Sequence, residues 1–342
     1  MKLVRTVDAV GQVLCHDLTQ IIVGVSKDAR FRKGHVVREE DIPVLLSMGK
    51  ENLYVWEFEE GMLHENEGAE ILCQACMNSS MEQGPVKEGK IELKATQEGV
   101  LEVDTKRLLA INSLGNVMIA TRANHSVVRL NDKLAGMRVI PLVIDAGQMK
   151  KVSAIADASN PLLSIHPFLI KDCTLLVTGS EVSKNLITDT FSPVVEQKLK
   201  ELGVVVTEKI YTGDDQAFIA TSIKKAVAGG SSMVICTGGM SVDPDDRTPG
   251  AIKESGANIV TYGAPVLPGA MFLISYLGDV PVLGLPGCVM YAKRTVFDLA
   301  LPRIVARIPL SGDDIAKWGN GGLCLQCPVC HFPNCNFGMG GI

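Results

Sequence analysis

The chain has 342 residues, a formal net charge of −5, and 46% hydrophobic against 21% charged residues. This length is sufficient for two or three domains, each with its own hydrophobic core. The slightly acidic balance argues against nucleic acid or an acidic membrane surface as a partner. No run of about 18 apolar residues predicts a spanning helix, and the first residues lack a signal-peptide core. We therefore expect a cytoplasmic protein whose ten cysteines are thiols or metal ligands.

The first 165 residues lack the regular alternation of strands and helices that predicts a parallel sheet. Asp41 is expected to cap a helix over residues 42–48, because a proline falls in the first turn and a glycine follows the last. A second helix is expected over residues 64–78, where Cys73 and Cys76 share one face as two buried thiols. Short strands are predicted after it, at residues 90–95, 99–103, 116–121, 126–130 and 137–144, and a connector at residues 150–160.

From residue 172 the alternation becomes regular. Strands are predicted at residues 173–177, 204–210, 233–236 and 259–262, followed by a hairpin of residues 271–277 and 280–285. Helices are predicted to begin at Ser192-Pro193, after Asp214 or Asp215, at Thr248-Pro249, and over residues 289–304. This alternation predicts an α/β fold, with a mainly parallel sheet and helices on both faces.

Four segments are therefore expected along the chain. Residues 1–80 form an N-terminal mixed α/β region, and residues 81–165 form a small β-rich unit and a linker. Residues 166–310 form the α/β domain, and residues 311–342 form a glycine-rich tail with a cluster of cysteines.

The loops that follow the strands of the α/β domain carry glycines or carboxylates. Ligand sites of open α/β sheets lie at this edge, where glycine turns let backbone N–H groups approach an anion. Two of the loops also carry aspartates that would hold a cation or act as acid and base. The loops are Thr178-Gly179-Ser180-Glu181, Gly213-Asp214-Asp215, the segment from Thr237-Gly238-Gly239 through Ser241 and Asp246 to Thr248, and Pro286-Gly287.

In this order and spacing, the loops make residues 172–305 resemble the molybdopterin-binding domain of molybdenum cofactor biosynthesis proteins. That family includes molybdopterin adenylyltransferases, molybdenum insertases and gephyrin. The resemblance implies a site for molybdopterin or its adenylylated form, with Asp214 and Asp246 as catalytic residues that also position Mg²⁺. The cofactor-binding residues that it implies are Thr178, Gly179, Ser180, Glu181, Asp189, Asp215, Thr237, Gly238, Gly239, Ser241, Thr248, Pro286 and Gly287.

The function implied by the resemblance is insertion of molybdenum, from molybdate, into molybdopterin. One alternative is a carrier that delivers the cofactor to a molybdoenzyme client, because the Asp-Gly-Tyr-Ala segment usual in insertases is absent here. Another alternative is a nucleotide pyrophosphatase, because a competence-related family with that activity shares the domain. Related domains commonly associate, so a homo-oligomer is also expected.

The tail holds Cys324, Cys327, Cys330 and Cys335, separated by two, two and four residues. Thiolates at such spacing ligate Zn²⁺ or iron–sulfur clusters, and the metal orders a segment poor in regular structure. The first two spacings match the run of bacterial ferredoxins, which favours a [4Fe–4S] cluster over Zn²⁺.

Overall fold

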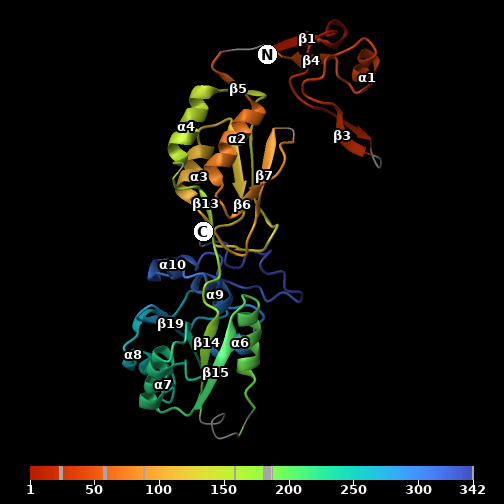
Figure 1. The fold of residues 1–342 in the computed structure, drawn as a ribbon. Coiled ribbons are helices and arrows are strands. Elements are labelled where there is room, and N and C mark those ends of the chain that lie inside the picture. The colour runs from red at the N-terminus through yellow and green to blue at the C-terminus, as the bar shows by residue number, and fades with distance from the viewer. Residues whose placement is uncertain are drawn as a thin grey trace. The chain divides into compact units, whose positions relative to one another are not determined.

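The structure is a computed structural model that describes residues 1–22, 26–56, 60–87, 89–157, 159–179, 186 and 188–340 (Figure 1). Its contacts divide the chain into two compact units. The first consists of residues 1–97, 103–122 and 129–164, and the second of residues 98–102, 123–128 and 165–342. Within the described part of the chain, no helix is both long enough and apolar enough to cross a membrane.

The first unit opens with a small region of short strands around one helix. Strand β1 (Lys2–Arg5) pairs antiparallel with β4 (Asn52–Val55), and β2 (Leu18–Ile22) pairs with β3 (Ser26–Phe31). A 3₁₀ turn, η1 (Thr6–Asp8), and helix α1 (Asp41–Ser47) complete the region. Helix α1 confirms the helix predicted at residues 42–48. The cap expected at Asp41 is wrong, because Asp41 is the first residue of the helix and its carboxylate accepts instead from the Arg38 amide before it (2.9 Å).

The rest of the first unit packs three helices with an antiparallel sheet. The sheet has the order β6–β7–β11–β9, with β6 (Met81–Gln83), β7 (Lys90–Ala95), β11 (Lys133–Val139) and β9 (Val117–Thr121). Strand β5 (Met62–His64) pairs with β12 (Val143–Asp145). The helices are α2 (Glu65–Cys76), α3 (Thr105–Asn112) and α4 (Ala146–Ala156). Helix α2 is confirmed with both thiols buried, and this burial raises the pKa of Cys73 to about 11 and of Cys76 to about 12.

Three features of this unit differ from the sequence prediction. The connector expected at residues 150–160 is wrong, because helix α4 occupies residues 146–156. Asp145 caps this helix, and its carboxylate accepts from the Gln148 amide (2.8 Å). Helix α3, capped by Asp104, was not expected at all. The single strand expected at residues 137–144 is two strands, β11 and β12, which belong to different sheets.

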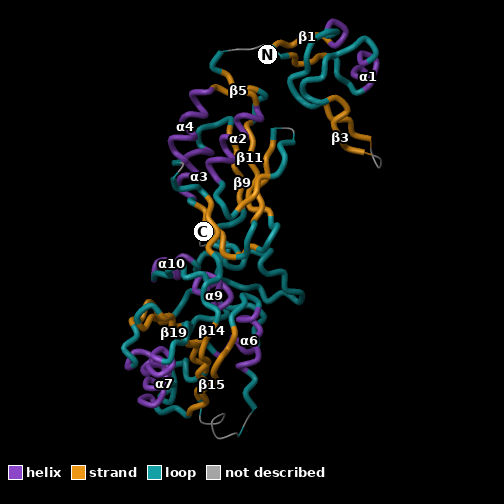
Figure 2. Tube along the Cα trace, in the orientation of Figure 1, coloured by secondary structure: helices purple, strands orange, loops and turns teal. Residues whose placement is uncertain are grey.

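The second unit is built on a six-stranded sheet of order β15–β14–β16–β19–β18–β17 (Figure 2). Strands β14 (Asp172–Thr178), β15 (Val205–Thr212), β16 (Val234–Thr237) and β19 (Val280–Leu285) are parallel. Strands β18 (Leu273–Leu277) and β17 (Asn258–Tyr262) extend the sheet antiparallel, and β18 and β19 form the predicted hairpin. The expected α/β class with a mainly parallel sheet is therefore confirmed.

Helices cover both faces of this sheet (Figure 1). Along β14, Cys173, Leu175 and Val177 join the core shared with α6 (Phe191–Lys200) and α9 (Val296–Val305). Leu176, which points to the other face, packs in the core of α7 (Gln216–Ala228) and α8 (Thr248–Glu254). This alternation places apolar side chains on both faces of the strand, as a doubly covered parallel sheet requires.

The end of the domain differs from the helix predicted over residues 289–304. A 3₁₀ turn, η2 (Gly287–Met290), comes first, and α9 begins only at Val296. The Thr295 and Asp298 side chains form a capping box there, which sets the helix start. Helix α10 (Gly312–Lys317) follows. A small sheet of order β10–β8–β13 adds β10 (Val127–Val128), β8 (Gly99–Val103) and β13 (Leu163–His166).

Candidate functional site

Four loops meet at one edge of the six-stranded sheet. The strands before them are parallel, and their last residues are neighbours in the register: Thr178 lies opposite Thr212, and Thr237 lies opposite both Val177 and Leu285. The carboxyl ends of β14, β15, β16 and β19 therefore lie together. This is the edge at which open α/β sheets place their ligands.

Glycine is required in the loop after β16. Gly238 and Gly239 both have positive φ, +87° and +56°. A Cβ on Gly238 would lie 2.3 Å from the Thr178 carbonyl oxygen, and one on Gly239 would lie 2.8 Å from Thr248 Oγ1. Both the backbone conformation and the lack of space therefore exclude larger residues at Gly238 and Gly239. Without side chains at these two positions, the backbone of the turn is left uncovered.

Two buried hydroxyls lock this turn against the neighbouring loop. Thr178 Oγ1 donates to the Thr237 carbonyl (3.0 Å), and Thr248 Oγ1 donates to the Gly238 carbonyl (2.9 Å). The two hydroxyl oxygens lie 3.1 Å apart, and both threonines are buried. The sequence predicts Thr178 and Thr248 as ligand contacts; in the structure their hydroxyls fix the shape of the glycine turn.

Thr237 is different from these two threonines. It is 1% exposed, and its Oγ1 has no hydrogen-bond partner among the residues that the structure describes. An unsatisfied buried hydroxyl costs stability and is rare in native proteins. At a predicted ligand-binding turn, this atom is available to a group that is not part of the protein.

The predicted carboxylates have separate local roles. Asp215 caps α7 by accepting from the Phe218 amide (3.0 Å), which leaves Asp214 half-buried at the preceding position. Asp246 is half-buried, and its carboxylate accepts from the Asp243 amide (3.2 Å) within the loop after β16. Ser241 lies exposed in the same loop.

Asp189 is the acceptor at the start of α6. Its carboxylate accepts from the amides of Phe191 (3.0 Å) and Ser192 (2.9 Å) and from the Ser192 hydroxyl. Partial burial opposes ionisation, but these hydrogen bonds and one from Tyr211 prevail and lower the pKa of Asp189. The helix predicted to begin at Ser192-Pro193 therefore begins one residue earlier, at Phe191, and the Asp189 carboxylate accepts the hydrogen bonds at its start.

The remaining predicted residues lie at the ends of two loops. Gly179 follows β14 with a φ of 134°, and its amide donates to the Thr212 carbonyl (3.1 Å). Ser180 and Glu181 lie outside the described residues. Pro286 and Gly287 connect β19 to η2, where Pro286 is the residue before the turn.

Tyr262 is a residue of this edge that no sequence pattern indicates. Its hydroxyl donates to the carbonyls of Met240 (2.9 Å) and Ser241 (3.3 Å), so it ties the loop after β16 to strand β17. Burial and the nearby Asp246 carboxylate raise the pKa of this tyrosine. A tyrosine at the end of a β-strand has no distinctive sequence signature, and only the pairing of the strands shows which loop it reaches.

Within the described part of the chain, no group of three or more His, Cys, Asp or Glu side chains is arranged to hold a metal ion. The four cysteines of the tail are therefore not gathered around a single point. Cys324 and Cys335 are half-buried, whereas Cys327 and Cys330 are exposed. Metal binding by these residues stays a prediction.

Comparison with family models gives two matches. Residues 174–306 match the model described as "Probable molybdopterin binding domain", which confirms the resemblance expected from the loops. Residues 3–57 match a model described as a domain of unknown function, DUF8806.

Curated relatives match only part of the chain. A "Molybdenum cofactor biosynthesis bifunctional protein" of Synechococcus elongatus is 30% identical over 84 residues, which are 25% of this chain and 26% of that protein. A "CinA-like protein" of Myxococcus xanthus is 37% identical over 93 residues, 27% of this chain and 22% of that protein. The chain thus spans about a quarter of the length of these relatives.

Solved structures similar to the chain include the molybdopterin biosynthesis enzyme MoaB of Thermus thermophilus. It has a TM-score of 0.35 at 18% identity and covers 41% of this chain and 96% of its own. The protein CinA of Thermoplasma acidophilum has a TM-score of 0.33 at 19% identity. The match covers 40% of this chain and 98% of that protein.

Proposed function

We propose that residues 174–306, which form a domain of the molybdopterin-binding family, bind the phosphate of molybdopterin at the edge of the sheet. The observation that carries the proposal is the turn at Thr237, Gly238 and Gly239. Two glycines with positive φ are held there beside a buried hydroxyl that no described group of the chain satisfies. A phosphate at this turn would meet backbone N–H donors with no Cβ in the way, and its oxygens would accept from the Thr237 hydroxyl.

A divalent cation would act at the same edge. Carboxylates beside a phosphate repel it unless a cation lies between them, and Mg²⁺ is commonly held by one or two carboxylates together with substrate phosphates. Asp246 and Asp214, in two of the four loops, fit this pattern, which does not need a complete cage of protein ligands. Bound Mg²⁺ would neutralise phosphate charge, and the two aspartates would position it and the reacting group.

The reaction we assign to this site is molybdenum insertion, with molybdate and molybdopterin or its adenylylated form as substrates. The name of the Synechococcus relative supports a place in molybdenum cofactor biosynthesis. A non-catalytic carrier that delivers the cofactor to a molybdoenzyme is the alternative, favoured by the absence of an Asp-Gly-Tyr-Ala segment. Turnover of adenylylated molybdopterin with molybdate would decide for the insertase.

The first test is equilibrium binding of molybdopterin to the anaerobically purified full chain, with and without Mg²⁺. Thr237→Val should weaken binding about tenfold, which corresponds to the loss of one hydrogen bond to a charged group. Asp246→Ala should remove most of the dependence on Mg²⁺. Asp279→Ala is the matched control, because this exposed carboxylate lies in the turn between β18 and β19, before β19 begins. Absence of saturable binding under every condition would exclude the pterin proposal.

A second function is favoured by the other relatives. Six curated relatives are CinA-like proteins, which match the chain at 30–37% identity over 74–113 residues. The anion site would then hold the pyrophosphate of a nucleotide, and hydrolysis would replace metal insertion. Release of phosphate or a nucleotide from ADP-ribose, without pterin binding, would favour this function.

A further inference from the structure

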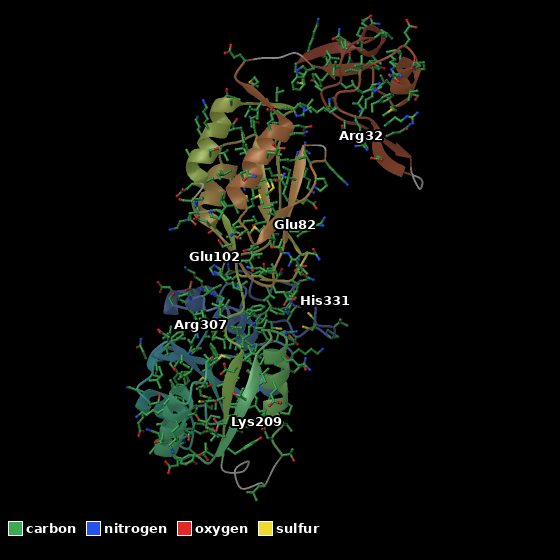
Figure 3. The ribbon with its side chains drawn as sticks, viewed as in Figure 1. Arg32, Glu82, Glu102, Lys209, Arg307 and His331 are labelled. Atoms are coloured by element: carbon green, nitrogen blue, oxygen red, sulfur yellow. The ribbon has the colours of Figure 1, made fainter. Side chains whose placement is uncertain are left out.

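The four tail cysteines all border one cavity. This cavity has a volume of about 410 Å³ and lies between the segment that precedes α9 and the tail after α10 (His331 is labelled in Figure 3). Cys324, Cys327, Cys330 and Cys335 line it, and no other cysteine of the described residues does. Although the thiols do not converge on one point, they line a common cavity that is partly open to solvent.

Hydrogen bonds hold both ends of the cysteine segment, the first to the α/β domain and the second to the start of the tail itself. The Cys324 amide donates to the Leu267 carbonyl (2.8 Å), and the Gly338 amide donates to the Gly321 carbonyl (3.0 Å). Phe337, next to the second anchor, is 5% exposed and belongs to the domain core. Residues 325–335 between the anchors contain no helix or strand, so the first and last cysteines are placed by the fold and the middle two lie on an irregular loop.

The charges at the cavity are positive. Lys293 and Arg294 line it, and none of its described lining residues is acidic. The Lys293 ammonium donates to the Pro328 carbonyl (2.7 Å), and Arg294 lines the same cavity. Arg294 also lies over the Phe332 ring, 5.0 Å from its centroid. Both cations are thus held against the cysteine segment.

This charge pattern selects the kind of ligand. A hard cation such as Mg²⁺ or Ca²⁺ needs oxygen ligands and negative charge, which the cavity does not offer. Four thiolates around a zinc ion, or around an iron–sulfur cluster, form a complex with a net charge of about −2. The Lys293 ammonium would offset part of that charge. The Arg294 guanidinium would contribute less, because it is paired with Asp298 (2.9 Å) and Glu201 (3.7 Å).

We propose that Cys324, Cys327, Cys330 and Cys335 form a four-thiolate metal centre, holding a zinc ion or an iron–sulfur cluster, which Lys293 and Arg294 stabilise electrostatically. Closure of the loop around the metal brings Cys327 and Cys330 to the two anchored cysteines. The centre is independent of the proposed pterin function, because its ligands lie outside the four loops of that site.

The test begins with the full chain purified anaerobically. Zinc, iron and acid-labile sulfide are measured per chain, and metal-free reduced protein is then loaded with zinc alone or with iron and sulfide. Binding of about one zinc, or of about four irons with a similar amount of sulfide, supports the proposal and identifies the metal. If the chain binds less than about a tenth of these amounts both with zinc and with iron and sulfide, the proposal is overturned.

Variants then assign the ligands. Cys327→Ser and Cys330→Ser, both at exposed positions, should each lower metal affinity at least tenfold, whereas Cys288→Ser, a half-buried thiol outside the cavity, should not. Unchanged metal binding in the two tail variants overturns the assignment. Thiol alkylation of the wild type provides a second measurement: bound metal should protect Cys327 and Cys330, and a chelator should release them. Alkylation at the same rate with and without metal overturns the proposal, whatever the variants do.

The electrostatic role of Lys293 is tested by comparing two lysine variants. Lys293→Gln should weaken metal binding by roughly threefold to tenfold, because a positive charge beside a net-negative complex is lost. Lys317→Gln, an exposed cation of the same unit that does not line the cavity, should leave it unchanged. Equal affinities of the two variants would contradict the stabilising role of Lys293.

Discussion

Two threonines at the ends of neighbouring strands have opposite hydrogen-bonding states. Thr178 Oγ1 donates to a carbonyl and lies 3.1 Å from the Thr248 hydroxyl. Thr237 Oγ1 has no partner within the described ranges, and both threonines are buried. Replacing a paired buried hydroxyl costs about 1–3 kcal/mol, but replacing an unpaired one removes a penalty. Thr178→Val should therefore lower the free energy of unfolding by about that amount.

Thr237→Val should leave the free energy of unfolding unchanged or raise it by up to about 1 kcal/mol, even though it weakens ligand binding. Chemical denaturation followed through Trp318, which is 7% exposed in the same unit, would measure both variants. A loss of stability in Thr237→Val equal to that in Thr178→Val would show that the Thr237 hydroxyl has a structural partner.

His125 should make the second unit sensitive to acid. Burial, followed by the charge of Arg303, lowers the pKa of this histidine from 6.5 to about 4. Between these values the unfolded chain binds the proton and the folded chain does not, so stability falls as pH decreases from 6.5 to about 4. We expect a loss of about 1–2 kcal/mol from this group, less than the full shift implies because the ring is only partly buried.

The wild type is compared with the variant His125→Asn, because asparagine tolerates the positive φ of 60° at this position. The unfolding free energy of the wild type, measured from pH 7.5 to 4, should fall relative to that of the variant as the pH decreases. Curves that stay parallel across this range would contradict a lowered pKa.

The ligand edge illustrates what single residues reveal in a sequence. Gly238, Gly239 and the aspartates could be predicted, because strand-to-helix turns with glycines have a recognisable pattern. The unpaired hydroxyl of Thr237 and the contacts of Tyr262 could not, since both depend on which atoms meet in three dimensions. The spacing of the four tail cysteines predicts metal ligands, which stays a prediction, but it does not indicate the cations that line the same cavity. These come from a segment about 30 residues earlier in the chain.

The turn between β16 and α8 should tolerate no side chain at its first glycine. Gly238 and Gly230 both have positive φ, +87° and +93°, but an added Cβ would lie 2.3 Å from a backbone carbonyl at Gly238 and meet nothing within 4 Å at Gly230. Gly230→Ala should therefore cost only about 1–2 kcal/mol of backbone strain. Gly238→Ala should cost more than about 3 kcal/mol, because the loop must shift as well.

Thermal or chemical unfolding of the two glycine variants, followed through Trp318, would measure the difference. Similar losses of stability would mean that the turn after β16 is not packed against Thr178. Molybdopterin binding of folded Gly238→Ala protein should also be weaker than that of Gly230→Ala, since only the first change alters the predicted anion site.

Helix starts were predictable where proline marks them, or where a capping aspartate follows glycine as it does before α7, and not where an aspartate cap stands alone. Helices α1 and α8 begin near prolines, and both were predicted. Helices α3 and α4 begin at aspartate caps within polar segments, and these capping hydrogen bonds set starts that composition does not reveal. The late start of α9 has the same cause, because the Thr295–Asp298 capping box overrides the apolar periodicity upstream.

The division of the chain into two units does not follow the order of the sequence. Residues 98–102 and 123–128 belong to the second unit, although the residues on either side of each segment belong to the first. Val100 in β8 is fully buried in the second unit's core, together with strand residues of β14. A single boundary at about residue 165 would assign these two segments to the first unit. Local sequence patterns do not show with which strand another strand pairs.

Loss of side-chain volume at Val100 should therefore destabilise the second unit and not the first. Val100→Ala should lower the free energy of unfolding by about 2 kcal/mol, measured through Trp318 in a Trp56→Phe background so that only the second unit is observed. Val139→Ala, an equally buried valine of the first unit, should leave the Trp318 transition unchanged. If Val139→Ala lowers that transition and Val100→Ala does not, β8 belongs to the core of the first unit instead.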